Sequence, residues 1–83
     1  MNLYKTRGVC SRMIAFEVDE DGALHNVAFE GGCNGNLQGI AALVEGMDVD
    51  EAIDRLSGIQ CGYKSTSCPD QLAQALKEYQ EEH

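Results

Sequence analysis

Residues 11–30 read SRMIAFEVDEDGALHNVAFE, and this stretch decides how the fold begins. Strongly apolar residues occupy every second position of its first part, which is the period of a strand that buries one face. Residues 19–22, Asp-Glu-Asp-Gly, are typical of a turn, and alternation resumes over residues 23–30. The alternating apolar residues are Ile14, Phe16 and Val18 before the turn and Val27 and Phe29 after it. The stretch therefore predicts an antiparallel hairpin.

The residues on either side of the hairpin predict a third strand and a first helix. Residues 3–6 can add a short strand on the N-terminal side. Residues 31–35, GGCNG, are too rich in glycine for regular structure and favour a plain turn over an anion-binding loop, because no Lys-Ser/Thr pair follows them. Asn36 is then the expected N-cap of a helix that ends at Gly46. The apolar residues of this helix, at helical spacing, are Leu37, Ile40, Ala41 and Val44.

Two further helices are predicted toward the C-terminus. Residues 48–51, Asp-Val-Asp-Glu, have the form of a capping box, and Gly58 is the expected end of the helix that follows. Pro69 suits the first position of a last helix, which makes Cys68 its expected N-cap. The predicted buried residues are Ala52, Ile53 and Leu56 in the first of these helices and Leu72, Ala75, Leu76 and Tyr79 in the second. The pattern predicts one α+β domain, residues 1–83, in which an antiparallel hairpin or three-stranded meander precedes three helices packed on one face.

The charge and the length of the chain limit the classes of function that it can have. Fourteen acidic residues against six basic ones give a net charge of -8, which opposes binding to nucleic acid or to anionic membrane surfaces. We find no signal peptide and no apolar run of membrane-spanning length, so we expect a cytoplasmic protein. In a reducing cytoplasm four cysteines are more naturally thiols, metal ligands or redox groups than disulfides. A core of this size supplies only about 3–5 kcal/mol, so a bound metal would stabilise the fold substantially.

The four cysteines lie at junctions between the predicted elements, where metal ligands and reactive thiols are usually found. They are Cys10, Cys33, Cys61 and Cys68, separated by 22, 27 and 6 residues. An N-capping Cys68 would face unpaired backbone N–H groups, which favour a thiolate. Because the hairpin returns the chain to its start, all four can meet at one end of the sheet, and four thiolates suit structural zinc. The alternative is that one or two of them are inert core residues.

Other candidate residues carry weaker signals. His25 and His83 are expected to be solvated, with a metal-ligand role for His25 as the lesser alternative. Asp70 either orients a metal ligand or compensates the helix dipole. Thr66 and Ser67 either donate hydrogen bonds to a sulfur or bond to the backbone at the helix start. No arrangement typical of nucleophilic catalysis is evident, so no catalytic residue is assigned.

Residues 66–70 read TSCPD, the motif for which the TSCPD domain family is named, and the chain resembles that family over nearly its whole length. The other matching stretches are residues 9–11, 31–36, 56–62 and 71–73. Members of the family occur as short free-standing proteins and as the C-terminal part of cobalamin-dependent (class II) ribonucleotide reductases. The resemblance implies metal ligation by Cys10, Cys33, Cys61 and Cys68 and names a ribonucleotide reductase as a candidate partner. It does not imply reductase activity, because 83 residues cannot hold the radical-bearing barrel or a cobalamin site.

The order of parts is also similar to that of U-type iron-sulfur scaffold proteins. Residues 46–52, GMDVDEA, look like the central segment of those proteins. Their three cysteines would correspond to Cys10, Cys33 and Cys68. Arg12 stands where the scaffolds have an acidic residue, and Ser67 stands where they have a histidine. These differences favour a stable zinc site over labile cluster transfer.

The predicted function is therefore that of a small cytoplasmic metal-binding domain with a four-cysteine zinc site and no catalytic activity of its own. The first alternative is a thiol redox or iron-sulfur-handling accessory of a class II ribonucleotide reductase. The second is a protein interaction module that zinc merely stabilises.

Overall fold

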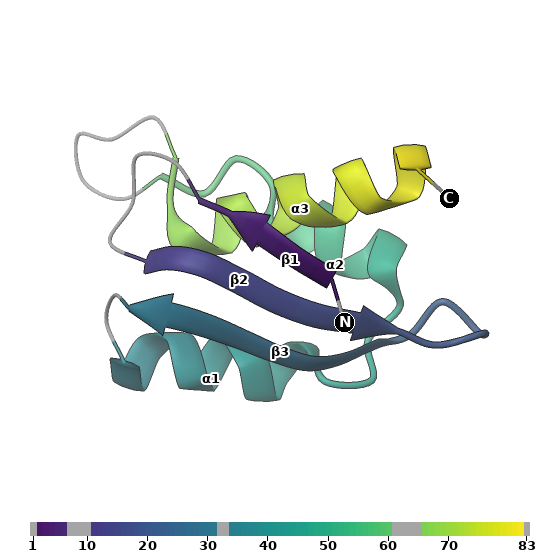
Figure 1. Cartoon of the computed structure of the whole chain (residues 1–83), viewed down its shortest axis with the longest axis horizontal. Coiled ribbons are helices and arrows are strands. Elements are labelled where there is room, and N and C mark those ends of the chain that lie inside the picture. The colour runs from purple at the N-terminus through teal and green to yellow at the C-terminus, as the bar shows by residue number, and fades with distance from the viewer. Residues whose placement is uncertain (1, 7–10, 32–33, 61–65, 83) are drawn as a thin grey trace.

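The computed structural model describes residues 2–6, 11–31, 34–60 and 66–82. These residues form a three-stranded antiparallel sheet followed by three helices, which confirms the predicted α+β fold class (Figure 1). The strands are β1 (Asn2–Lys5), β2 (Ser11–Val18) and β3 (Leu24–Gly31), in the spatial order β1-β2-β3. The helices are α1 (Asn34–Val44), α2 (Val49–Leu56) and α3 (Cys68–Glu82). Among the described residues, no helix combines the length and the apolarity that crossing a bilayer requires.

The turn of the hairpin forms where the sequence predicts it. The carboxylate of Asp19 accepts hydrogen bonds from the backbone N–H groups of Asp21, at 2.9 Å, and Ala23, at 3.0 Å. Gly22 has a φ of 83°, a left-handed conformation that side chains disfavour. Asp19 therefore stabilises the turn by accepting backbone hydrogen bonds, and Gly22 stabilises it by adopting a backbone geometry that other residues disfavour.

A bulge in β3 changes which of its residues face the core. Ala15 pairs with Ala28, whereas Glu17 pairs with His25, so β3 contains one more residue than β2 over this interval. Asn26, within the bulge, has a φ of 55°. Because of the extra residue, Leu24 lies on the same side as Val27, and both are buried. Strict alternation places these two residues on opposite faces, so the sequence prediction missed Leu24.

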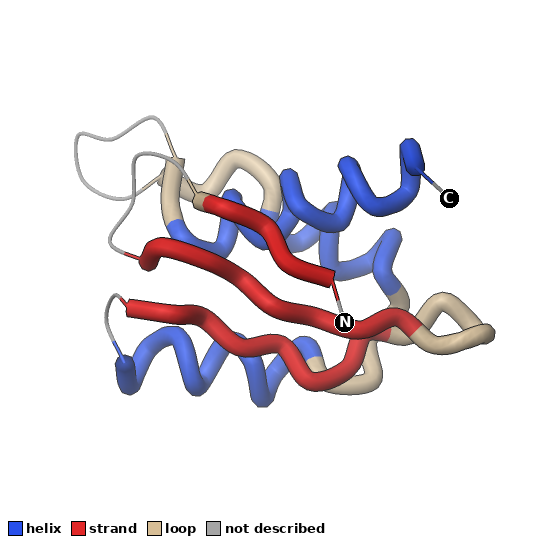
Figure 2. The backbone as a smooth tube through the Cα atoms, in the orientation of Figure 1, coloured by secondary structure: helices blue, strands red, loops and turns tan. Residues whose placement is uncertain are grey.

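One core lies between the sheet and the helices. Its buried apolar residues are Ile14, Phe16, Leu24 and Val27 from the sheet and Val44, Val49, Ala52, Ile53, Leu72, Ala75 and Leu76 from the helices. Val18, Phe29, Leu56 and Tyr79, also predicted to be apolar contacts, are partly buried against this cluster. Helix α1 packs along β3, and α3 packs against both α2 and β2 (Figure 2). The helices thus cover the face that the alternation predicts to be buried.

The first helix begins earlier than predicted. It starts at Asn34, so Asn36 lies inside its first turn and the prediction that Asn36 is the N-cap is wrong. Two glycines within α1 weaken a local helix signal, but Leu37 and Val44 are buried and hold the helix on β3. The helix ends as predicted before Gly46, whose φ is 78° and whose N–H donates to the Leu24 carbonyl oxygen at 2.6 Å.

The start of α2 is capped by Asp48, as predicted. Its carboxylate accepts a hydrogen bond from the Asp50 backbone N–H at 3.4 Å. The Glu51 carboxylate, instead of returning to the cap, forms an ion pair with Arg55 at 2.8 Å. Gly58, the predicted stop, has a φ of 84°.

The bulge makes Leu24 a test of the core. We expect Leu24→Ala to lower the free energy of unfolding by about 2–5 kcal/mol, because the side chain is fully buried and its removal leaves a cavity. Leu43→Ala is the matched control, since Leu43 is 77% exposed and its loss should change stability by less than about 0.5 kcal/mol. Urea denaturation of both variants measures the difference. Equal effects would mean that Leu24 does not face the core.

Candidate functional site

The N-cap of α3 is Ser67, not Cys68. The Ser67 hydroxyl oxygen accepts a hydrogen bond from the Asp70 backbone N–H at 3.1 Å, and its carbonyl oxygen accepts one from the Gln71 N–H at 2.8 Å. Cys68 is therefore the first helical residue and Pro69 the second. The prediction that Cys68 is the cap is wrong because a hydroxyl oxygen is a much better acceptor than sulfur, and the chain offers one directly before the cysteine.

Asp70 is the centre of a buried polar network. Only 8% of the residue is exposed. One carboxylate oxygen accepts a hydrogen bond from the Gly58 backbone N–H at 2.7 Å. The other accepts hydrogen bonds from the Thr66 hydroxyl at 2.5 Å and the Gln74 side-chain amide at 2.8 Å. Asp70 thus joins the chain after α2 to the segment before α3 and to the first turns of α3.

The hydrogen bonds decide the charge state of Asp70. Burial alone raises the pKa of its carboxyl group, but the bonds from Thr66, Gly58 and Gln74, with a smaller contribution from the charge of Lys77, outweigh burial. The pKa therefore lies below its ordinary value of 3.8. The sequence predicts that Asp70 either compensates the helix dipole or orients a metal ligand. In the structure its carboxylate joins three chain segments through hydrogen bonds. The Ser-x-x-Asp spacing of Ser67 and Asp70, which resembles a capping box, is a signal that could have indicated part of this role.

The predicted ligands are described only in part. Cys68 is half-buried at the start of α3. Cys10, Cys33 and Cys61 lie outside the described residues, as do residues 32 and 33 of the predicted glycine-rich turn. The rest of that turn is in regular structure, contrary to the prediction, because Gly31 ends β3 and residues 34 and 35 begin α1. Within residues 2–6, 11–31, 34–60 and 66–82, no three histidine, cysteine or acidic side chains are arranged to hold a metal ion.

The described ends of the neighbouring elements gather at one end of the molecule. Ser11, which follows Cys10, pairs with Gly31, which precedes Cys33 by two residues. The start of β2, the end of β3, the start of α1 and the start of α3 all lie on the left in Figure 1. These described ends therefore lie near one another, whereas the convergence of the cysteines themselves stays a prediction.

His25 lies at the opposite end of the sheet and contacts two carboxylates. Its Nδ1 is 2.5 Å from Glu45 Oε2, and its Nε2 is 2.7 Å from Asp19 Oδ2. The side chain is 35% exposed, so the prediction of a solvated histidine is incomplete. Glu45 also accepts a hydrogen bond from the Asn26 backbone N–H at 2.9 Å, which ties the bulge to the end of α1. No pattern in the sequence indicated that the residue after α1 would reach this histidine.

These contacts shift three protonation equilibria. Hydrogen bonds to Asp19 and then Glu45 raise the pKa of His25 above its ordinary value of 6.5. The pKa of Asp19 is lowered, first by the hydrogen bond from the Ala23 backbone and then by His25. The pKa of Glu45 is lowered by the Asn26 backbone and then by His25. Each ring nitrogen faces a carboxylate oxygen, which accepts hydrogen bonds, and this arrangement favours the doubly protonated imidazolium.

Replacement of Asp70 tests how much its hydrogen bonds contribute to the stability of the fold. We expect Asp70→Asn to lower the free energy of unfolding by about 1.5–3 kcal/mol at pH 7, because a buried charged acceptor of three hydrogen bonds is lost. A lowered pKa stabilises the fold above pH 3.8, and this contribution is lost as the pH falls through the folded-state value. Wild type and variant should therefore converge in acid. Asp54→Asn, on the exposed side of α2, is the control, and an equal effect of both substitutions would contradict the assignment.

The carboxylates around His25 can be tested by titration. We expect Glu45→Gln to lower the pKa of His25 toward 6.5, as followed by the imidazole proton resonances in NMR spectra. A raised histidine pKa stabilises the fold below pH 6.5, and this contribution is lost as the pH rises through the folded-state value. Glu20→Gln, in the same turn region, should leave the titration unchanged. Identical curves for Glu45→Gln and wild type would contradict the contact.

Comparison with known proteins gives one match. Neither the curated proteins nor the solved structures contain a match to this chain. The family model of the TSCPD domain matches residues 2–80, which include the sheet, α1, α2, the Ser67 cap and the Asp70 network. The match covers nearly the whole chain and confirms the resemblance noted in the sequence. The chain therefore belongs to the TSCPD domain family.

Proposed function

We propose that the chain is a metal-binding domain in which Cys10, Cys33, Cys61 and Cys68 hold one structural zinc ion. The donor set fits this ion, because four cysteine thiolates are the ligands of closed tetrahedral zinc sites. Zinc bound in this way supplies stability and fixed geometry, with no open position for a substrate.

The pairing of Ser11 with Gly31 is the observation that carries the proposal. It brings together the two strand ends that continue into Cys10 and Cys33. Cys10 directly precedes Ser11, and Cys33 follows Gly31 by two residues. Since consecutive Cα atoms are about 3.8 Å apart, each cysteine is separated from the paired strand ends by a short length of chain. A site shared by these two cysteines is therefore favoured over separate locations.

The Asp70 network supports the participation of the other two cysteines. Its bond to the Gly58 N–H joins the segment leading to Cys61 to the helix turn that carries Cys68. Thr66, two residues before Cys68, is fixed by the same carboxylate. We infer that Asp70 holds the C-terminal ligand pair from outside the metal site.

The role of Ser67 favours stable zinc over a transferable iron-sulfur cluster. The residue is 4% exposed, and its hydroxyl oxygen accepts the Asp70 N–H. Its side chain therefore caps the helix at the position where the U-type scaffolds have a histidine.

The partner that the sequence resemblance suggests is a ribonucleotide reductase or another protein.

Metal content and thermal stability test the proposal. Protein purified without chelator or an immobilised-metal column should contain one zinc per chain. Apparent zinc-binding energies in small peptides are about 10–16 kcal/mol, so a strong chelator should lower the melting temperature sharply. Cys68→Ser should weaken zinc binding, as measured by competition with a chromophoric chelator.

Ser67→Ala is the matched control for Cys68→Ser. It should cost about 1 kcal/mol of stability through loss of the cap while the zinc content stays at one per chain. Absence of metal together with a melting curve that a chelator does not change would rule out the proposal. Rapid, reversible loss of two hydrogens from Cys61 and Cys68 in metal-loaded protein treated with thioredoxin would instead favour the redox function.

A further inference from the structure

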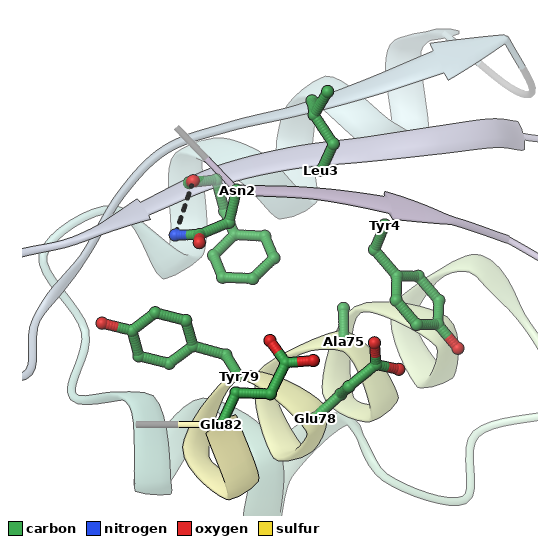
Figure 3. A pocket seen from close by; sticks show the side chains of 8 residues that line it. Asn2, Leu3, Tyr4, Ala75, Glu78, Tyr79 and Glu82 are labelled. Carbon is green, nitrogen blue, oxygen red and sulfur yellow. Dashed lines mark hydrogen bonds between the residues drawn. The ribbon is translucent and has the colours of Figure 1, made fainter.

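A groove separates the outer edge of β1 from the C-terminal half of α3. It encloses a cavity of about 60 Å³, and its walls come from the strand and from the helix. Figure 3 shows the side chains of Glu78 and Glu82 directed from the helix toward the strand, with Tyr4 and Tyr79 on the two sides. The residues that matter for the argument are Asn2, Tyr4, Phe16, Glu78, Tyr79 and Glu82.

The strand beside this groove is an edge strand. The sheet order is β1-β2-β3, so β1 pairs with β2 on one side and with no other described strand. The Thr6 N–H donates to the Arg12 carbonyl oxygen, which fixes the ladder: backbone groups of even-numbered residues in β1 face β2. Those of Leu3 and Lys5 therefore point away from β2, at the outer edge of the sheet.

At the opposite edge of the sheet, the start of β3 forms hydrogen bonds with another segment. The backbone of Leu24, at the start of β3, exchanges hydrogen bonds with Gly46 and Met47. Ala23 forms an isolated bridge with Asp48, and α1 packs along the remainder of β3. Among the described residues, the β3 edge is thus partly paired or covered, whereas no segment pairs with the outer edge of β1.

We propose that the β1 edge and this groove together bind an extended basic segment of a partner protein, which adds an antiparallel strand beside β1. Backbone pairing with Leu3 and Lys5 supplies affinity, and the groove selects the side chains. The inference does not depend on the metal site, because none of the groove residues is a predicted ligand.

Charge and ring chemistry define what the groove accepts. Glu78 and Glu82 are four residues apart on α3, so their carboxylates lie on one face and repel each other. An arginine or lysine between them relieves this repulsion. The rings of Tyr4 and Tyr79 beside the carboxylates add cation–π attraction. The net charge of -8 further attracts a basic partner and repels an acidic one.

The strand register gives the alternation of the partner segment. Side chains of Asn2 and Tyr4 face the helices, whereas Leu3 and Lys5 face the open side of the sheet. In an added strand, residues opposite Tyr4 point into the groove and are basic. Residues opposite Leu3, which is 63% exposed, are apolar. The partner segment therefore alternates basic and apolar residues.

A second copy of this chain fits the edge poorly. Pairing of two β1 strands across a two-fold axis would bring two sets of Glu78 and Glu82 together between two chains of charge -8. It would also leave the acidic groove without a cation. The proposed occupant is therefore a different, basic polypeptide.

The probe is a six-residue peptide of alternating arginine and valine, blocked at both ends and labelled for fluorescence anisotropy. We expect binding to the full chain and shifts of the Leu3 and Lys5 amide resonances in NMR spectra. Glu78→Gln/Glu82→Gln should weaken binding about tenfold, since two charge pairs and their ring contacts are lost. Glu20→Gln/Asp54→Asn removes the same charge from exposed positions outside the groove and should change binding less than about twofold.

Methylated peptides test the backbone pairing directly. In the antiparallel arrangement the valine N–H groups face β1, so N-methylation of the valines should weaken binding by about tenfold or more. N-methylation of the arginines should have little effect. Equal loss in both groove and control variants, or loss on arginine methylation, would overturn the proposal. The proposal would also be overturned if the free chain formed a dimer in sedimentation experiments and the Leu3 and Lys5 amides of that dimer were protected from hydrogen exchange.

Discussion

The buried carboxylate of Asp70 is the interaction on which the arrangement of the C-terminal half depends. A charged group with so little exposure is tolerated only when its oxygens accept several hydrogen bonds. Here the donors come from Gly58 after α2, from the residue before the Ser67 cap and from α3 itself. These hydrogen bonds hold Gly58 and Thr66 to the first turns of α3. The sheet and α1 rely instead on apolar packing.

Much of this fold follows from short-range patterns in the sequence. Period-two alternation identified β2, Asp-Gly chemistry identified the turn, and the helix stops at Gly46 and Gly58 have the left-handed backbone that their residue type indicates. The bulge at Asn26 was not predicted, because nothing local states that an extra residue will be accommodated there. It depends on tertiary contacts, chiefly the Glu45 carboxylate that binds the Asn26 N–H from nineteen residues away.

Prediction of the candidate site was more uneven. The TSCPD motif and the family match agree, and the architecture brings the described flanks of the cysteines to one end of the molecule. The cap lies one residue earlier than Pro69 predicts, because proline suits the second helical position as well as the first. The buried character of Asp70 could not be seen either, since an acidic residue in a first helical turn has the same sequence pattern whether it faces solvent or the Gly58 N–H.

The bulge in β3 also constrains how this chain can change in evolution. A one-residue deletion at Asn26 would restore regular pairing with β2, and Leu24 would stay on the same face as Val27 because a single residue would then separate them. The deletion would, however, remove the Asn26 backbone N–H that donates to the Glu45 carboxylate, and with it the bond that ties β3 to the residue after α1. Insertions are easier to accommodate among the exposed residues of the turn, such as Glu20 and Asp21, than beside the bulge. Length variation among relatives should therefore concentrate at the tip of the hairpin and leave the spacing between His25 and Phe29 intact.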